Sequence, residues 1–339
     1  MSKAAELAAL IGSQTALSNR NLIINGDMQC WQRATSATAA ANGYSTVDRW
    51  YMTENTDGAY TTERSTDHPF SSGYSLKCQV TTADTSLSAA QSAFLDHYIE
   101  AQNLQHLNYG TSNAKSLTLS FWVKSNKTGT YTISLYKQDS TAYMYTKEYT
   151  ISSANTWEKK IITISPTAGS TSFITSSGGA IANDNGSGLG LSHGLAWGSN
   201  FTGGTSDSWS STVANYSTTN HVNWMDSTAN NFYLAQVQLE VGEQATPFEH
   251  RSIGDELARC ERYYQLSGTN GSNFFVSTNY NSGNNWATCE FRTVMRTSPS
   301  VTATYSNSPS NTHISDRAVS WQWTSTSTFA VNVKADAEL

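Results

Sequence analysis

The sequence predicts a mainly β protein, with an antiparallel jelly-roll or β-sandwich domain, a linker helix and a second, small β domain. Apolar and polar residues alternate in many short stretches, as they do in half-buried strands. Turn-forming residues separate these stretches at intervals of roughly eight to twelve positions. Only 14% of the 339 residues are charged. Ser, Thr, Asn and Gly take their place, and these residues favour turns and short strands over long helices.

Residues 20–249 form the predicted sandwich domain. Its clearest strands cover residues 117–123 and 131–135, because apolar side chains occupy every second position and a turn joins the two. Residues 93–105 are ambiguous, and their pattern favours a strand that ends near Glu100, followed by a helical turn. Further strands are expected at residues 22–25, 46–53, 59–65, 74–81, 143–151, 157–164, 189–195 and 232–239.

A linker helix is predicted over residues 250–266. Gly242 ends the strand before it, and Ser252 opens the helix with Asp255 three residues on, which forms a weak capping box. The helix carries an apolar stripe at positions i, i+4, i+7 and i+11, and we expect this stripe to join the two β domains. The stripe consists of Ile253, Leu257, Cys260 and Tyr264.

The two ends of the chain predict self-association. Residues 1–19 are expected to form a short helix and an arm, and Leu7 and Ile11 lie on a narrow apolar stripe that has no obvious partner. This helix either packs on its own domain or frays, or it docks to another subunit. Residues 267–339 are expected to form a β domain with few large apolar side chains, and copies could complete each other's core. Both features favour a homotrimer.

Residues 167–230 are rich in Gly, Ser, Asn and Asp, yet they contain several aromatic residues. Exposed loops of this kind are common recognition sites, because aromatic rings stack on ligands while small polar residues supply adaptable hydrogen bonds. The alternative is that the aromatic residues are buried anchors that tie a long loop to the sandwich. The candidate ligand-binding residues are Trp197, Trp209 and Trp224.

The sequence predicts a protein that is not an enzyme. Residues 190–194, G-L-S-H-G, match a nucleophile elbow around Ser192. That elbow needs a strand, a turn and a helix, whereas the match lies in an alternating strand. The seven histidines show no metal-ligand spacing, and the carboxylates are scattered singly, so neither a metal site nor a catalytic acid pair is indicated.

Several partners are excluded by composition. The net charge of −6 at pH 7 argues against nucleic acid, since nothing would attract a phosphate backbone. No apolar stretch is long enough to span a membrane, so we expect no membrane insertion.

The four cysteines form no C-x-x-C pair, and buried free thiols are the expected state. Residues 48–50, D-R-W, form either a sugar platform or a buried tryptophan beside an ion pair, and the second is favoured.

Four blocks of sequence resemble tail-fibre and related virion proteins of tailed bacteriophages and prophages. They occur in the order found in that family and lie between about residue 2 and residue 266. The blocks are NLIINGDMQCWQR (residues 21–33), VDRW (47–50), KSLTLSFWVKS (115–125) and EVGEQATPFEHRSIGDELARCERYYQ (240–265).

The resemblance implies a jelly roll of the carbohydrate-binding-module type in a structural protein of the virion, made in the host bacterial cytoplasm. It implies contact with other virion proteins and, as part of a tail fibre or adhesion component, with a host-surface glycan or another envelope component. Three alternatives stay open: a capsid-decorating or head-fibre protein, a glycan-degrading enzyme of the tailspike type, and a free carbohydrate-binding module of a cellular protein.

The resemblance also implies a place for a structural calcium ion, but no other cofactor. Jelly rolls of this type often hold calcium between an early N-G-D turn and a D-D pair in the last strand. The turn is present at residues 25–27, which makes Asp27 the candidate ligand, but the pair has become Ala235 and Gln236. We therefore favour the alternative in which Asp27 bonds turn amides.

Overall fold

The computed structural model describes residues 19–38, 42–267, 275–277, 285–305, 308–323 and 329–339. The chain divides into two compact units, Met1–Arg251 and Ser252–Leu339. The division lies close to residue 249, where the sandwich domain was expected to end. The helix predicted within residues 1–19 lies outside the described residues.

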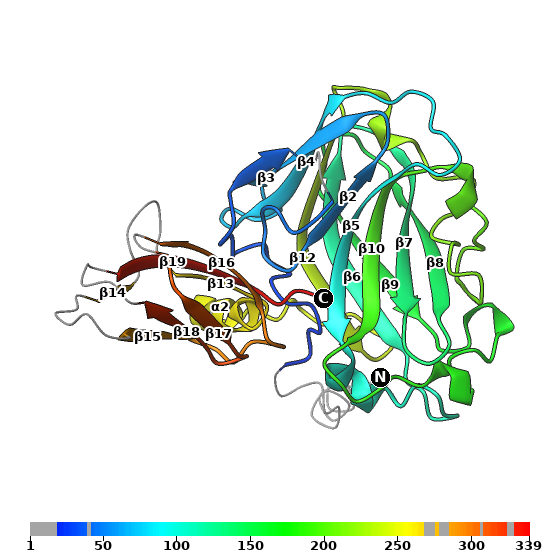
Figure 1. The fold of residues 1–339 in the computed structure, drawn as a ribbon. Helices are drawn as coiled ribbons and strands as arrows, with labels where there is room; N and C mark the ends of the chain where they lie inside the picture. Colours follow the sequence, from blue (N-terminus) through cyan, green and yellow to red (C-terminus); the bar gives the residue numbers. More distant parts are fainter. Residues whose placement is uncertain (1–18, 39–41, 268–274, 278–284, 306–307, 324–328) are drawn as a thin grey trace. The chain divides into compact units, whose positions relative to one another are not determined.

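The larger unit is built from two six-stranded antiparallel sheets, which confirms the predicted fold class (Figure 1). The first sheet has the order β1 (Ser36–Thr38), β3 (Ala59–Ser65), β4 (Ser75–Thr82), β12 (Asn231–Val241), β6 (Leu117–Ser125) and β9 (Glu158–Ile164). The second sheet has the order β11 (Ser208–Ser210), β8 (Tyr143–Ile151), β7 (Gly129–Lys137), β10 (Ser187–Trp197), β5 (Ser92–Glu100) and β2 (Tyr51–Asn55).

A single hydrophobic core lies between the two sheets. On β6 and β10 every second side chain points inward, and these side chains pack in one cluster with those of the other strands. Trp50 is fully buried in that cluster. Its neighbour Asp48 lies 3.6 Å from Arg33, so the D-R-W motif belongs to the scaffold and is not a sugar platform.

The strand expected at residues 22–25 is instead a turn over residues 24–27. Asn25 has a φ of 58°, which a strand does not accommodate. Its side-chain oxygen accepts hydrogen bonds from the backbone N–H groups of Gln29 (2.8 Å) and Cys30 (2.9 Å). These bonds close the turn, and the segment is joined to β12 by single hydrogen bonds such as that from Leu22 N to Leu239 O at 2.8 Å.

The strand expected at residues 46–53 begins only at Tyr51, because Arg49 has a φ of 72°. Several other expectations from periodicity are confirmed. The strands β3 and β8 have the predicted bounds, and β5 ends at Glu100, where the 3-10 helix η2 (Ala101–Leu107) begins. The short strands β1 and β11 were missed, because three residues give no measurable period. In the described part of this unit, further 3-10 turns are η3 (Ala168–Ser170), η4 (Ser177–Gly179), η5 (Ser199–Phe201) and η6 (Trp224–Asp226).

The smaller unit begins with α2 (Ile253–Glu261). Ser252 caps this helix as predicted, since its Oγ accepts from Asp255 N at 3.1 Å. Two small antiparallel sheets follow. The strands are β13 (Tyr264–Ser267), β14 (Phe275–Ser277), β16 (Ser300–Tyr305) and β19 (Phe329–Asp336) in one sheet, and β15 (Asn285–Glu290), β17 (Asn311–Ile314) and β18 (Ala318–Trp323) in the other.

The predicted stripe on the linker helix is corrected by the structure. Ile253 is 61% exposed, Leu257 is half-buried and only Cys260 is fully buried. The helix ends at Glu261, because the chain turns there to pair β13 with β19, and Tyr264 is therefore a strand residue. The four residues do not form one packing surface.

The core of the smaller unit is centred on Trp321 and Trp323, which are both almost completely buried.

All four cysteines of the chain are buried free thiols, as expected. Among the described residues, no helix has the length and apolar character needed to cross a membrane.

Candidate functional site

The three candidate tryptophans of the 167–230 region are buried. Their exposed fractions are 6% for Trp197, 2% for Trp209 and 0% for Trp224. The indole N–H of Trp209 donates to Ser165 O at 2.9 Å, and that of Trp224 donates to Asn231 O at 3.1 Å. Both anchor loops to the sandwich, so neither offers a face on which a ligand could stack.

Trp197 points outward from β10 but is covered by the loop that follows. It stacks against Phe94 at a centroid distance of 4.7 Å and against Tyr216 at 5.0 Å. The loop over residues 198–222 is held to β7 by a bond between the hydroxyls of Thr132 and Ser217 at 3.1 Å. The prediction that Trp197 is an exposed recognition residue is therefore wrong.

Beside this loop, tyrosine side chains stand on the outer face of the second sheet. On β5, Phe94, Asp96 and Tyr98 point outward, because they alternate with buried Leu95 and Ile99. The strands β5, β10 and β7 lie side by side in that order (Figure 1), and Gly190 of β10 pairs with Tyr98 on one side and Tyr136 on the other. Six half-buried rings form what we call the aromatic face: Tyr44, Tyr51, Phe94, Tyr98, Tyr136 and Tyr216.

Because Gly190 has no side chain, no side-chain atoms rise from β10 at the centre of the aromatic face. A Cβ at this position would lie 3.0 Å from the ring of Tyr98, closer than side-chain atoms normally approach. Glycine inside a strand commonly marks such a close approach. The ring of Tyr98 therefore leans over the β10 backbone, and Tyr51 meets it edge-on at a centroid distance of 6.5 Å.

Asp96 lies below these rings and is only 3% exposed. Its carboxyl group accepts hydrogen bonds from the hydroxyls of Ser192 and Tyr98, the latter at 3.0 Å. Burial raises the pKa of Asp96 to about 7, against the lowering effect of the two hydrogen bonds. Ser192 lies in the middle of β10, and its hydroxyl donates to the buried carboxyl group of Asp96 on β5. The chain continues as a strand on both sides of Ser192, so it does not form a nucleophile elbow there.

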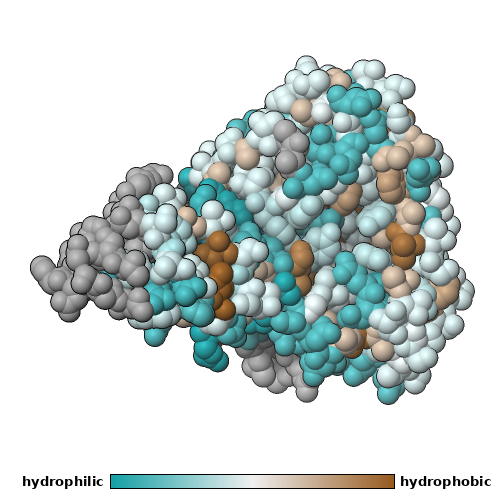
Figure 2. Space-filling model, viewed as in Figure 1, coloured by the Kyte–Doolittle hydropathy of each residue, from teal (hydrophilic) through white to brown (hydrophobic). Residues whose placement is uncertain are grey.

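The aromatic face can bind a ligand that has both apolar faces and hydroxyl groups. Tyrosine rings offer a flat apolar surface, and their hydroxyls donate and accept hydrogen bonds. The side of the larger unit seen in Figure 2 is mainly white and teal with only small, separate brown areas.

A cleft of about 480 Å³ opens on the other sheet. It contains Asp27, the residue considered for calcium. Its lining is shared by the first sheet, the loop between β3 and β4 and the segment before Arg251, and consists of Asp27, His68, Phe70, Ser72, Ser120, Trp122, Lys159, Gln236, Pro247, Phe248 and His250.

The residues near Asp27 do not fit a calcium site. The turn at residues 25–27 does lie beside β12, since Val237 N donates to Gly26 O at 2.9 Å. The carboxylate of Asp27, however, faces two imidazoles, His68 at 3.6 Å and His250 at 3.9 Å. Calcium requires a cage of oxygen ligands. Within the described part of the chain, no three His, Cys, Asp or Glu side chains are grouped to hold a metal ion.

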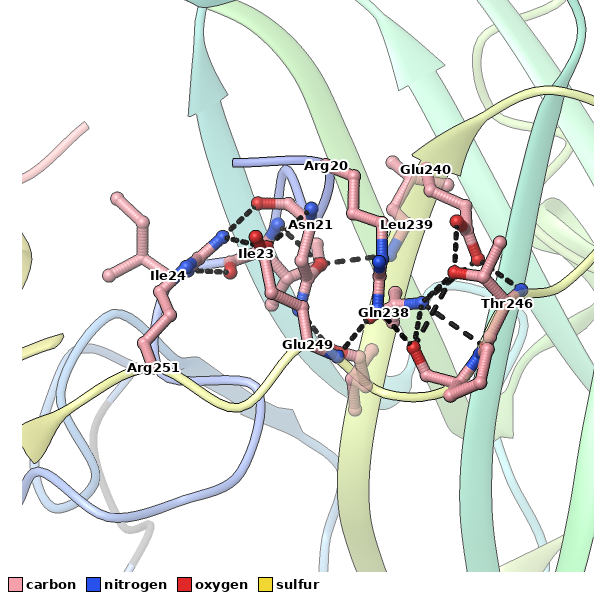
Figure 3. A network of polar contacts seen from close by, with 12 residues as sticks. Arg20, Asn21, Ile23, Ile24, Gln238, Leu239, Glu240, Thr246, Glu249 and Arg251 are labelled. Carbon is pink, nitrogen blue, oxygen red and sulfur yellow. Dashed lines mark hydrogen bonds and ion pairs between the residues drawn. The ribbon is translucent and has the colours of Figure 1, made fainter. Parts of the chain in front are cut away.

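One wall of the cleft is held by the polar network of Figure 3. Thr246 N donates to Glu240 at 2.8 Å, and Glu249 N donates to the side chain of Gln238 at 2.8 Å. Arg251 donates to Ile23 O at 3.1 Å and lies 3.0 Å from the carboxylate of Glu249. These contacts fix the segment that carries Pro247, Phe248 and His250 against β12.

Sequence reasoning missed both surfaces. The signal for the aromatic face was present in Gly190, Ser192 and Gly194, because small residues at every second position leave a flat outward surface. The cleft has no comparable signal. Asp27 and His68 are brought together only by the tertiary fold.

No family model matches the chain, and no curated protein matches it. Among solved structures, the chain is similar to one described as a sugar binding protein from Bacteroides thetaiotaomicron, with 12% identity, 66% of this chain and 100% of that chain covered, and a TM-score of 0.37. It is also similar to a family 11 carbohydrate-binding module from Clostridium thermocellum solved with a tetrasaccharide. The identity is 10%, the match covers 63% of this chain and 99% of that chain, and the TM-score is 0.32.

A further similar structure is the enzymatically active domain of tailspike protein 4 from bacteriophage CBA120. The identity is 12% and the TM-score is 0.33. The match covers 66% of this chain but spans only 22% of the tailspike chain.

Proposed function

We propose that this chain is a non-enzymatic structural protein of a tailed-bacteriophage virion that binds a glycan on the host surface through its aromatic face. The observation that carries the proposal is the arrangement of half-buried tyrosines around Gly190, above the buried carboxyl of Asp96. This arrangement offers stacking surfaces and hydroxyl groups on a nearly uncharged floor.

The placement of two tyrosines on either side of β10 suits an extended oligosaccharide. Tyr98 and Tyr136 stand on the two strands that flank β10. Neighbouring strands lie about 4.8 Å apart, so the backbones of these residues are separated by roughly 10 Å. A glycan that crosses the strands can place successive sugar rings over the two tyrosines while its hydroxyl groups bond the tyrosine hydroxyls.

The place in a virion is proposed from sequence. The four blocks between residues 21 and 265 resemble proteins of the phage adsorption apparatus, which supports a tail-fibre or adhesion component. Several copies on one particle would multiply a weak contact with one glycan into firm attachment. We propose a homotrimer as the unit of assembly, and light scattering should give three times the chain mass of 36.9 kDa.

The test is binding of the purified full-length protein to arrayed surface polysaccharides and to host cells. We expect binding, competition with virus attachment, and loss of both in Tyr136→Ala. A matched control is Tyr74→Ala, because Tyr74 is a half-buried tyrosine packed under Arg64 at 4.6 Å, away from the aromatic face. Absence of binding to every glycan and cell surface would contradict the proposal, as would equal binding by Tyr136→Ala and wild type.

A further inference from the structure

We propose that the cleft on the first sheet is a second saccharide site, which binds a sugar ring bearing a carboxylate. It lies on the opposite sheet from the aromatic face and uses none of its residues. The inference therefore goes beyond the proposed function and does not depend on it.

Three aromatic side chains give the cleft its apolar surface. Trp122 stands half-buried on the outer side of β6, the strand next to the edge strand β9 of the first sheet. Phe70, which is 50% exposed, meets it edge-on at a centroid distance of 5.6 Å. Phe248 lines the same space. A sugar ring presents C–H groups on one face, and an indole is the side chain best suited to receive them.

At one end of the cleft, two buried polar atoms lack hydrogen bonds. They are Oδ1 of Asp27 and Nε2 of His68, which lie 3.6 Å apart, too far for a direct bond. The side chain of His68 is only 2% exposed. A hydroxyl group can donate to the carboxylate and accept from the imidazole N–H, so one sugar hydroxyl satisfies both atoms.

Gln236 adds a second recognition group at the same end. It is 6% exposed and has a φ of 48°, at the irregularity where the pairing of β12 with β6 skips from Ala235 to Gln238. Its amide forms no hydrogen bond with any part of the chain that the structure describes. Bulges and left-handed residues outside glycine are concentrated at functional sites. Here the bulge places an amide with free donors and acceptors in the cleft.

At the other end of the cleft lies an unpaired cation. Lys159 of β9 is the register partner of Trp122, and within the described residues it forms no ion pair. The strand order β12, β6, β9 places Trp122 between Gln236 and Lys159. A sugar centred on Trp122 would therefore direct hydroxyl groups toward Asp27 and Gln236, and a carboxylate toward Lys159. This polarity favours a uronic acid over a neutral hexose.

The inference is tested with matched pairs of methyl glycosides that differ only at carbon 6: glucuronide and glucoside, galacturonide and galactoside, mannuronide and mannoside. Binding to the full-length chain is measured by saturation-transfer NMR and calorimetry. We expect at least one acidic glycoside to bind about tenfold more tightly than its neutral partner, because the ammonium group of Lys159 forms a charge-assisted bond with the carboxylate. Added salt should reduce this preference.

Variants locate the site. We expect Trp122→Ala to abolish binding of the acidic glycoside, Lys159→Gln to weaken it about tenfold and Lys159→Arg to retain it. The control is Lys115→Gln, which removes an exposed lysine elsewhere. Its affinity and all melting temperatures should match wild type.

Three results would overturn the second site: no acidic glycoside binds, acidic and neutral partners bind equally, or binding survives in Trp122→Ala. Loss of binding in Tyr136→Ala alone would place the acidic sugar on the aromatic face. That outcome would remove the second site and leave the proposed function standing, so the two can fail separately.

Discussion

The two outer faces of the sandwich are built from different residues, although they cover the same core. On the second sheet, β10 presents Gly190 and Ser192 outward, and tyrosines from neighbouring strands stand around this low floor. On the first sheet, Trp122 and Lys159 project from the strands, and loops raise walls around them. One face is flat and nearly uncharged, and the other is a recess with charged groups at its two ends.

This difference shows that, in a β-sandwich, inward-facing residues determine stability and outward-facing residues determine what can bind. Inward positions of both sheets are apolar because they share one core, and core packing tolerates little change. Outward positions carry no such constraint, so the two faces can acquire different chemistry on the same scaffold. The flat face suits an extended neutral chain, and the recess suits the end of a charged one.

The largest expected effect concerns Asp96, the buried carboxyl under the aromatic face. Its folded-state pKa of about 7 lies above its ordinary value of 3.8, so the folded protein holds the proton more tightly than the unfolded chain. The resulting stabilisation is fully present below pH 3.8 and is lost as the pH rises to about 7. Compared with Asp96→Asn, the wild type should lose on the order of 3 kcal/mol of unfolding free energy across this range.

Denaturant titrations at several pH values check this prediction. The buried imidazoles of His193 and His221, whose pKa values burial lowers to about 3 and about 4, act in the opposite direction. They are common to both proteins and cancel in the difference. Parallel pH profiles for wild type and Asp96→Asn would show that this carboxyl keeps its ordinary pKa.

The next effect separates the two faces by ligand. The double variant Tyr98→Ala, Tyr136→Ala removes two stacking rings, worth together about 2 kcal/mol, so the affinity for the best neutral glycan should fall roughly thirtyfold. Calorimetry with the arrayed glycan that binds best gives the affinity. Trp122→Ala is the matched control, since it removes an aromatic ring from the other face and should leave this affinity unchanged. Equal losses in both proteins would mean that the faces are not independent.

Arg251 tests whether the cleft wall is held by the network of Figure 3. Its guanidinium donates to the backbone oxygens of Asn21 and Ile23 and pairs with Glu249. Arg251→Ala should cost about 1–2 kcal/mol of stability and weaken acidic-sugar binding in the cleft. Binding at the aromatic face should persist, which thermal melts and the two ligand titrations would reveal. If both ligands are lost together, the substitution has disturbed the whole sandwich.

The smallest effect is expected at Gly190. An added methyl group would approach the Tyr98 ring at about 3.0 Å, and the ring can move by a few tenths of an ångström. Gly190→Ala should therefore cost less than about 1 kcal/mol of stability, yet weaken glycan binding a few-fold because the floor is raised. Binding equal to wild type would show that the ligand does not pass over β10.

Much of the fold could be predicted because strand periodicity is local. The bounds of β3 and β8 follow from alternation alone, and the helix cap at Ser252 follows from two residues. The turn at residues 24–27 could not be predicted, because the apolar residues Leu22 and Ile24 occupy alternate positions, as they would in a strand. What decides the turn is the side chain of Asn25, which bonds the backbone of Gln29 and Cys30.

The candidate sites were harder to predict for a physical reason. The sequence of a polar loop does not show whether a tryptophan in it is buried or exposed. Trp209 and Trp224 are buried, and their indole N–H groups donate to backbone oxygens. The rings that stand outward, such as Tyr98, lie in ordinary strands. The pair of Asp27 and His68 depends on the approach of two loops, which no spacing in the sequence encodes.

The most direct test of the central claim is a crystal structure of the full-length protein with the neutral glycan that binds it best. The account predicts a sugar chain over Gly190 on the second sheet, with rings stacked on Tyr98 and Tyr136. A glycan bound elsewhere, with the aromatic face empty, would contradict it.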